Sequence, residues 1–202
     1  MRRKRRAGAA YWSFGAMAAL GFVAGVGSAL WGMKHGGGAE VHDGWAGSKV
    51  TGSTEADPWT RAQVALTGLL ALNRSQAIYF TRRTDDAGQP LRADCRYRVE
   101  GGALPARWWS ITVYAADDYL PLNDDDALSF DATEVRSDAQ GRWVASVAAH
   151  KPASGAWASS RNAGAFDLTL RLYNPTPAAQ ADFGAIPFPR VVRMGCGKGD
   201  AA

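Results

Sequence analysis

Two clusters of acidic residues are the densest group of reactive side chains in this chain of 202 residues. Asp117-Asp118 and Asp124-Asp125-Asp126 lie close together in turn-like sequence. Carboxylate-rich loops can hold Ca²⁺, which takes about six to eight oxygen ligands. The spacing, however, does not match a calcium loop with alternating Asp residues, a Gly and a distal Glu. We therefore favour a solvated loop and predict no metal site.

Paired carboxylates could also carry out glycoside hydrolysis, which needs two carboxyl groups placed across the scissile bond. The candidates are Asp118 or Asp131 together with Glu134. Nothing in the sequence places these acids in one cleft, and Asp is ordinary in turns. A glycan-acting hydrolase or lyase that uses Asp and Glu side chains is therefore kept as the alternative function.

A catalytic triad would have to use His150, because the other two histidines precede the predicted domain. No Gly-x-Ser-x-Gly nucleophile elbow is present to accompany it. We expect His150 to be an exposed loop residue and expect His35 and His42 to be solvated. The catalytic residues are thus unknown, and no cofactor is predicted.

Several aromatic residues and one arginine could form a binding surface instead. Aromatic rings stack on sugars or fill apolar pockets, and arginine binds carboxylates through two hydrogen bonds. The same residue types also pack the ends of sheets and pair across strands, so the structural interpretation stays open. The candidate binding residues are Trp108, Tyr114, Trp157, Arg171 and Tyr173.

These candidates lie in or beside segments whose alternation of apolar and polar residues predicts β-strands. In 164–173 the residues Phe166, Leu168, Leu170 and Leu172 are expected inward, with Asp167, Thr169, Arg171 and Tyr173 outward. Short strands separated by turns indicate a mainly β fold with two packed sheets, a β-sandwich. The predicted strands are Gln76–Arg83, Asp94–Val99, Arg107–Ala115, Leu128–Phe130, Trp143–Ala149, Gly164–Tyr173 and Val191–Met194.

One amphipathic helix is predicted in front of the strands, over residues 58–73. Asp57 suits the N-cap and Pro58 the first helical position. Asn73 is a plausible stop. We expect the apolar stripe of this helix to pack on another element, most simply a sheet; the stripe consists of Trp59, Ala62, Leu66, Leu69 and Leu70.

The stretch Tyr11–Met33 carries no charge, and as a helix it spans roughly 34 Å, enough to cross a bilayer core. Five basic residues occupy positions 2–6, so the positive-inside rule keeps the N-terminus cytoplasmic. A cleaved signal peptide is the other interpretation, with Gly37-Gly38-Ala39 as the cleavage-like site. We favour a single-pass anchor in a bacterial inner membrane, with the rest in the periplasm.

The expected organisation follows from this topology. Removing the five charges at residues 2–6 from the formal net charge of +4 leaves −1, so no nucleic-acid partner is predicted. In order, we expect a basic cytoplasmic N-terminus (1–10), a transmembrane anchor (11–33), a tether with at most one short strand (34–56), a β-sandwich domain (57–196) and a flexible tail (197–202).

Of the two cysteines, Cys95 lies early in the predicted domain and Cys196 near its end. In an oxidising exported compartment such a pair indicates a disulfide that closes a long loop. In a reducing compartment they would be two unrelated buried thiols. Given the predicted export, we favour the disulfide.

The segments RWWSITVYAADDYL (107–120) and FDLTLRLYNP (166–175) carry a family resemblance, supported by residues 56–80 and by CRYRVEG (95–101). Over roughly residues 52–194 the chain resembles the family called domain of unknown function 1214. The resemblance implies a jelly-roll-like β-sandwich and implies no established reaction.

Many members of that family resemble the C-terminal half of a longer protein whose N-terminal half is domain of unknown function 1254. The resemblance therefore suggests a companion chain that carries this second domain. The sequence departs from the family pattern at Leu122-Asn123 and after Trp157, where Ala158-Ser159 follows. We expect a membrane-anchored, envelope-facing domain that binds a partner protein or an envelope ligand.

Overall fold

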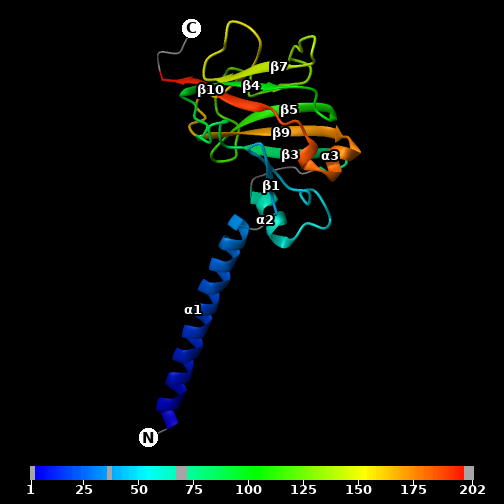
Figure 1. Cartoon of the computed structure of the whole chain (residues 1–202). Coiled ribbons are helices and arrows are strands. Elements are labelled where there is room, and N and C mark those ends of the chain that lie inside the picture. The colour runs from blue at the N-terminus through cyan, green and yellow to red at the C-terminus, as the bar shows by residue number, and fades with distance from the viewer. Residues whose placement is uncertain (1–2, 36–37, 67–71, 198–202) are drawn as a thin grey trace.

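The computed structural model describes residues 3–35, 38–66 and 72–197 (Figure 1). Within these ranges the fold is mainly β, with two sheets and three helices. The long helix α1 (Arg3–His35) extends away from the sheets, while α2 (Pro58–Leu66) and α3 (Pro177–Ala181) are short. A 3₁₀ turn, η1 (Phe183–Ala185), follows α3.

The larger sheet has six strands in the order β1-β2-β3-β9-β5-β6, and every neighbouring pair is antiparallel. The chain therefore crosses over repeatedly, so that residues far apart in sequence become neighbours. The strands are β1 (Glu40–His42), β2 (Trp45–Gly47), β3 (Ala77–Arg82), β5 (Ala106–Ala115), β6 (Ser129–Asp131) and β9 (Phe166–Pro175).

The smaller sheet has four strands in the order β10-β4-β7-β8. Its first two pairs are antiparallel, whereas β7 and β8 run parallel. The strands are β4 (Cys95–Gly101), β7 (Trp143–Ala148), β8 (Ala156–Ser159) and β10 (Arg190–Cys196).

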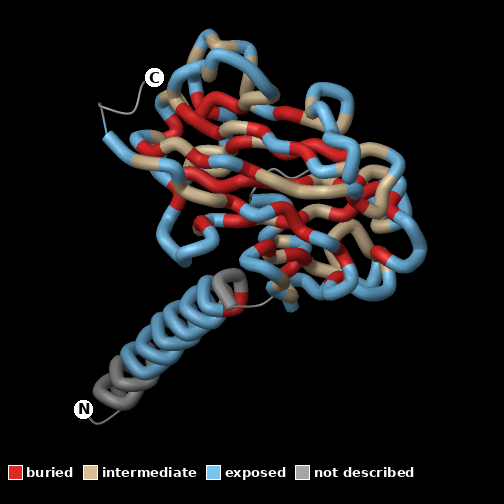
Figure 2. The backbone as a smooth tube through the Cα atoms, turned by 45° about the horizontal axis from the view of Figure 1, so that its top comes forward, coloured by how far each residue is buried: buried red, intermediate tan, exposed pale blue. Residues whose placement is uncertain are grey.

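One hydrophobic core lies between the sheets, and Figure 2 shows buried backbone along the strands. Phe166, Leu168, Leu170 and Leu172 are all buried, as the alternation predicted. Contact between the sheets includes the stacked rings of Trp109 and Trp143, whose centroids are 4.6 Å apart. Each large apolar side chain removed from water in this way contributes about 1.5–3 kcal/mol.

All seven predicted strands are present, with ends displaced by no more than two residues. The structure also contains β8, which was not predicted, and two strands, β1 and β2, in the segment where at most one was expected. β1 and β2 form a hairpin around Asp43-Gly44, whose φ angles of 50° and 80° suit a two-residue turn. Trp45 is fully buried, so this part of the expected tether pairs with the sheet. The domain boundaries themselves stay predictions.

The expected packing of the amphipathic helix on a sheet is wrong for its described part. The N-terminus is as predicted, because Asp57 Oδ1 accepts hydrogen bonds from the backbone N–H groups of Trp59 and Thr60. Trp59 and Leu66 nevertheless remain 39% and 72% exposed. The periodicity of apolar residues predicted the apolar stripe of α2, but it could not specify which element the stripe packs against. Leu69 and Leu70 lie outside the described residues.

The disulfide between Cys95 and Cys196 is confirmed. The two cysteines are directly opposite each other in β4 and β10, at a Cα–Cα distance of 3.9 Å. The bridge therefore joins adjacent strands and closes a loop with a sequence separation of 101. It is consistent with an oxidising compartment.

Helix α1 contains the apolar stretch Trp12–Gly32, which has a mean hydropathy of 1.6. This stretch is long and apolar enough to cross a membrane. Almost all residues of this stretch are exposed, as the colour of the α1 tube shows (Figure 2). Phe14, Leu20 and Phe22 are among the exposed large apolar residues.

Candidate functional site

The outer face of the six-stranded sheet gathers most of the predicted binding residues. Antiparallel pairing places Trp108 opposite Tyr173, and Tyr114 opposite Asp167. Directly opposed residues share a face, and the alternate residues of β5 and β9 fill the core. We use the name outer face for Tyr79 and Thr81 of β3, Trp108, Ser110, Thr112 and Tyr114 of β5, and Asp167, Thr169, Arg171 and Tyr173 of β9.

Arg171 lies at the centre of the outer face, between Tyr79 and Ser110 in register. Its Nη1 donates to Thr112 Oγ1 at 3.0 Å, and its Nη2 donates to the hydroxyl of Tyr114 at 2.7 Å. The guanidinium also lies over the Tyr114 ring, 5.4 Å from the centroid. These contacts fix a half-buried cation through neutral groups.

No carboxylate among the described residues forms an ion pair with Arg171, although other arginines have such partners. Its charge does act on Asp167, whose pKa it lowers, but the two groups make no ion-pair contact. A guanidinium fixed in this way suits recognition of a carboxylate or another anion, because its geometry is set before binding.

Trp108 and Tyr173 form an aromatic pair at one end of the outer face. Their ring centroids are 5.1 Å apart with planes tilted by 50°, and both residues are half-buried. Such a pair presents apolar surface beside the arginine. It could pack against a sugar ring or an apolar side chain of a partner.

Asp167 and Thr169 point outward as predicted, but each is only 7% exposed. Flanking side chains on a crowded sheet face can cover short ones. Burial raises the pKa of Asp167 to about 6. The charge of Arg83 lowers this pKa, from 3.7 Å away, and the charge of Asp118 raises it.

Trp157 does not join the other candidates. It belongs to β8 of the smaller sheet, where its Nε1 donates to the backbone oxygen of Ala148 at 3.0 Å. The sequence placed Trp157 with the other aromatics only by residue type. Conversely, Asp167, Thr112 and Thr169 were missed as site residues, since alternation alone makes them look like ordinary outward residues.

Several carboxylates of the acidic turns are engaged in hydrogen bonds and ion pairs within the protein. Asp125 accepts hydrogen bonds from Nε and Nη2 of Arg161, at 2.9 and 2.7 Å, and from Ser159 Oγ at 2.6 Å. The Ser159 hydrogen bond is the largest influence that lowers the pKa of Asp125. Asp131 and Glu134 stabilise one turn, where Glu134 accepts from the backbone N–H of Asp131.

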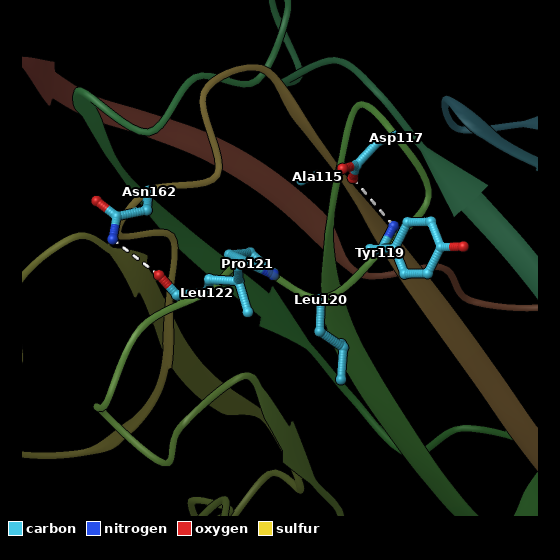
Figure 3. A pocket seen from close by; sticks show the side chains of 7 residues that line it. All are labelled: Ala115, Asp117, Tyr119, Leu120, Pro121, Leu122 and Asn162. Carbon is cyan, nitrogen blue, oxygen red and sulfur yellow. Dashed lines mark hydrogen bonds between the residues drawn. The ribbon is translucent and has the colours of Figure 1, made fainter.

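A hollow of about 460 Å³ lies beyond the end of β5 (Figure 3). Its loop is fixed by hydrogen bonds from Tyr119 N to Asp117 and from Asn162 Nδ2 to the backbone oxygen of Leu122. Tyr119 and Leu122 are 72% and 89% exposed. The lining residues are Ala115, Asp117, Tyr119, Leu120, Pro121, Leu122 and Asn162.

His150 is exposed after β7. Within the described ranges, no group of three or more His, Cys, Asp or Glu residues is arranged to hold a metal ion. The chemistry available on the outer face is therefore that of a fixed cation, an aromatic pair and one buried carboxyl group.

Residues 76–177 match the sequence model of a family described as a protein of unknown function, DUF1214. The match spans just over half of the chain. The chain belongs to this family. The DUF1214 match contains β3 to β9 and hence the outer face in full.

Solved structures also resemble this DUF1214 chain. The VPA0106 protein from Vibrio parahaemolyticus is 20% identical with a TM-score of 0.57, over 70% of this chain and 36% of that one. An uncharacterized protein from Burkholderia cenocepacia is 16% identical with a TM-score of 0.44, over 58% of this chain and 29% of its own. The Vibrio likeness supports the fold alone. The search of curated proteins gave no match.

Proposed function

We propose that this protein is a single-pass protein of a bacterial inner membrane that holds a jelly-roll-like β-sandwich in the periplasm. The apolar stretch Trp12–Gly32, the basic residues at 2–6 and the Cys95–Cys196 disulfide support this topology. In this proposal the domain is a binding module whose outer face recognises a partner protein or an envelope ligand.

The binding proposal rests on the way in which the side chain of Arg171 is held. Two hydroxyl groups and an aromatic ring orient its guanidinium, while among described residues it has no ion-pair partner. Orienting a cation without neutralising it costs free energy in the unbound protein. A bound carboxylate would recover that cost, and Trp108 with Tyr173 would supply apolar contact beside it.

A companion chain with domain of unknown function 1254 is the partner that we propose first. The matched part covers 36% of the Vibrio chain, so in that protein it is joined to much additional sequence. In our proposal, a separate companion chain in the same compartment takes the place of that additional sequence and binds the outer face.

In-cell photocrosslinking tests the binding surface. We would replace Trp108 with p-benzoylphenylalanine and use the same replacement at Trp157, on the smaller sheet, as the matched control. We expect a crosslinked adduct from position 108 and little from position 157. Adding Arg171→Gln should reduce the adduct severalfold, and mass spectrometry would identify what is attached.

Equal crosslinking from positions 108 and 157 would contradict the outer face as the binding surface. Full crosslinking in the Arg171→Gln background would contradict the role of the guanidinium.

The alternative function, a glycan-acting envelope hydrolase or lyase, is favoured by Asp167. A carboxyl group whose pKa is raised to about 6 by burial is suited to donate a proton near neutral pH. The second carboxylate would be that of Asp118, whose charge raises the pKa of Asp167. Asp118 is also one of the acids singled out from the sequence.

Release of reducing ends from purified peptidoglycan tests this alternative. If Asp167 is the general acid, Asp167→Asn lowers the rate at least about a hundredfold. Asp138→Asn, in a turn before β7, is the matched control and should keep the rate. No release by the unaltered protein would contradict the alternative.

A further inference from the structure

The apolar stripe of α2 does not pack on the β-sheets in the described part of the chain. Trp59 and Leu66 are seven residues apart, about two helical turns, so they lie on the same side of the helix. They are 39% and 72% exposed, whereas the buried residue of α2 is Thr60. The exposed stripe therefore faces away from the β-sheets.

The position of α2 relative to α1 indicates what covers this stripe. A Cβ atom placed on Gly32 would lie 2.9–3.2 Å from three ring atoms of Trp59. The indole thus lies directly against bare backbone at the last residue of the apolar stretch. Trp31, next to Gly32, is itself 67% exposed. Figure 1 shows α2 beside the end of α1 nearest the sheets.

This level of α1 is where a membrane-crossing helix meets the headgroup region. Tryptophan is enriched there because its ring is apolar and its N–H is polar. A helix with an apolar stripe on one side can lie in the plane of this region, with the stripe buried among the upper acyl chains. Trp59 is a tryptophan at this level, and together with Leu66 it forms an apolar stripe on one side of α2.

We propose that α2 binds the lipid surface of the bilayer that α1 spans, with Trp59 and Leu66 inserted at the headgroup boundary. This inference rests on the proposed membrane anchoring. The N-cap contacts of Asp57 hold the start of α2, and α2 packs beside the end of α1. Insertion of Trp59 would therefore place the start of α2 at the lipid surface, next to the end of the membrane-crossing helix.

Site-specific fluorescence on the full chain tests the proposal. Both cysteines are paired in the disulfide, so one introduced cysteine can be labelled with the environment-sensitive dye NBD. We would label Leu66→Cys in α2, Val23→Cys within α1 and Val144→Cys, 51% exposed on β7, as the water-exposed control. Each is reconstituted in phosphatidylcholine–phosphatidylglycerol vesicles that contain lipids with a nitroxide at the headgroup or deep in the acyl chain.

We expect the dye at position 66 to be quenched severalfold more by headgroup nitroxides than the dye at position 144. The dye at position 23 should respond to deep nitroxides. If position 66 behaves like position 144 while position 23 is quenched, the anchor stands and the present inference is overturned. If position 23 is not quenched, the anchor itself is wrong. A blue-shifted but unquenched dye at position 66 would indicate a second protein copy and would overturn lipid binding.

A second variant tests the contact that places the helix. Gly32→Leu puts a side chain where the Trp59 ring lies, so it should displace α2 and reduce quenching at position 66 severalfold. Gly27→Leu is the matched control, since nothing lies within 4 Å of a Cβ at Gly27. Unchanged quenching in the Gly32→Leu protein would overturn the claim that Trp59 packing sets the position of α2.

Discussion

Asp167 is a carboxyl group on an outward strand position that is buried all the same. Its pKa is raised from an ordinary 3.8 to about 6, so the folded protein binds a proton there more tightly than the unfolded chain does. Stability associated with this group is therefore present at low pH and is lost as pH rises from about 4 to about 6.

We predict that Asp167→Asn stabilises the protein at neutral pH, because the amide needs no ionisation in a buried place. The shift in pKa corresponds to about 3 kcal/mol, and the gain should be smaller because the ion pair with Arg83 is also lost. The measurement is the free energy of unfolding of both proteins from pH 4 to pH 8. The difference should grow up to about pH 6 and then level off.

Asp138→Asn should show the opposite sign. Hydrogen bonds from the backbone and side chain of Arg142 lower the pKa of Asp138, so its stabilisation exists at neutral pH and fades as pH falls. The same unfolding series measures this loss of stability.

For Asp167→Asn, a difference in the free energy of unfolding that does not change with pH would show that burial does not perturb this carboxyl group.

At the scale of elements, β9 joins β3 to β5 at the centre of the larger sheet. Leu170 is fully buried there, so Leu170→Ala should destabilise the fold by about 2–5 kcal/mol through lost burial and a remaining cavity. The midpoint of denaturant unfolding measures this. Val144→Ala, at an exposed position of β7, should change the free energy of unfolding by no more than about 0.5 kcal/mol. Equal effects would contradict the assignment of the core.

The disulfide connects β4 and β10 and restricts the unfolded chain over a long loop. Replacing both Cys95 and Cys196 with Ser should lower the free energy of unfolding by about 2–5 kcal/mol. Denaturant unfolding followed by tryptophan fluorescence measures the change. A reducing agent should shift the unaltered protein and leave the double variant unchanged. If the reducing agent has no effect on the unaltered protein, the bridge does not stabilise it.

At the scale of the whole molecule, the proposed topology predicts which residues are reachable from outside the inner membrane. Gln140→Cys, in an exposed turn before β7, should react with a membrane-impermeant maleimide in intact spheroplasts. Ala7→Cys, within the basic N-terminal segment, should react only after permeabilisation. Gel-shift of the labelled protein measures both. The reverse pattern would place the sheets in the cytoplasm.

The sequence by itself determined the features that depend on neighbouring residues. Alternation with a period of two located the strands and assigned Leu168, Leu170 and Leu172 to the core. An uncharged stretch identified the candidate span, and two cysteines in a domain that we expected to be exported identified the bridge. The residues of β5 and β9 were also sufficient to recognise the DUF1214 family.

Only the tertiary structure decided which of these features meet. Register across β5 and β9 brought Arg171 together with Tyr114 and left Trp157 on the other sheet. Packing on the sheet also buried Asp167, and the ring of Trp59 packs against Gly32 near the end of α1. Periodicity states which side of an element is apolar, but pairing between distant strands and helices depends on long-range contacts that no local pattern contains.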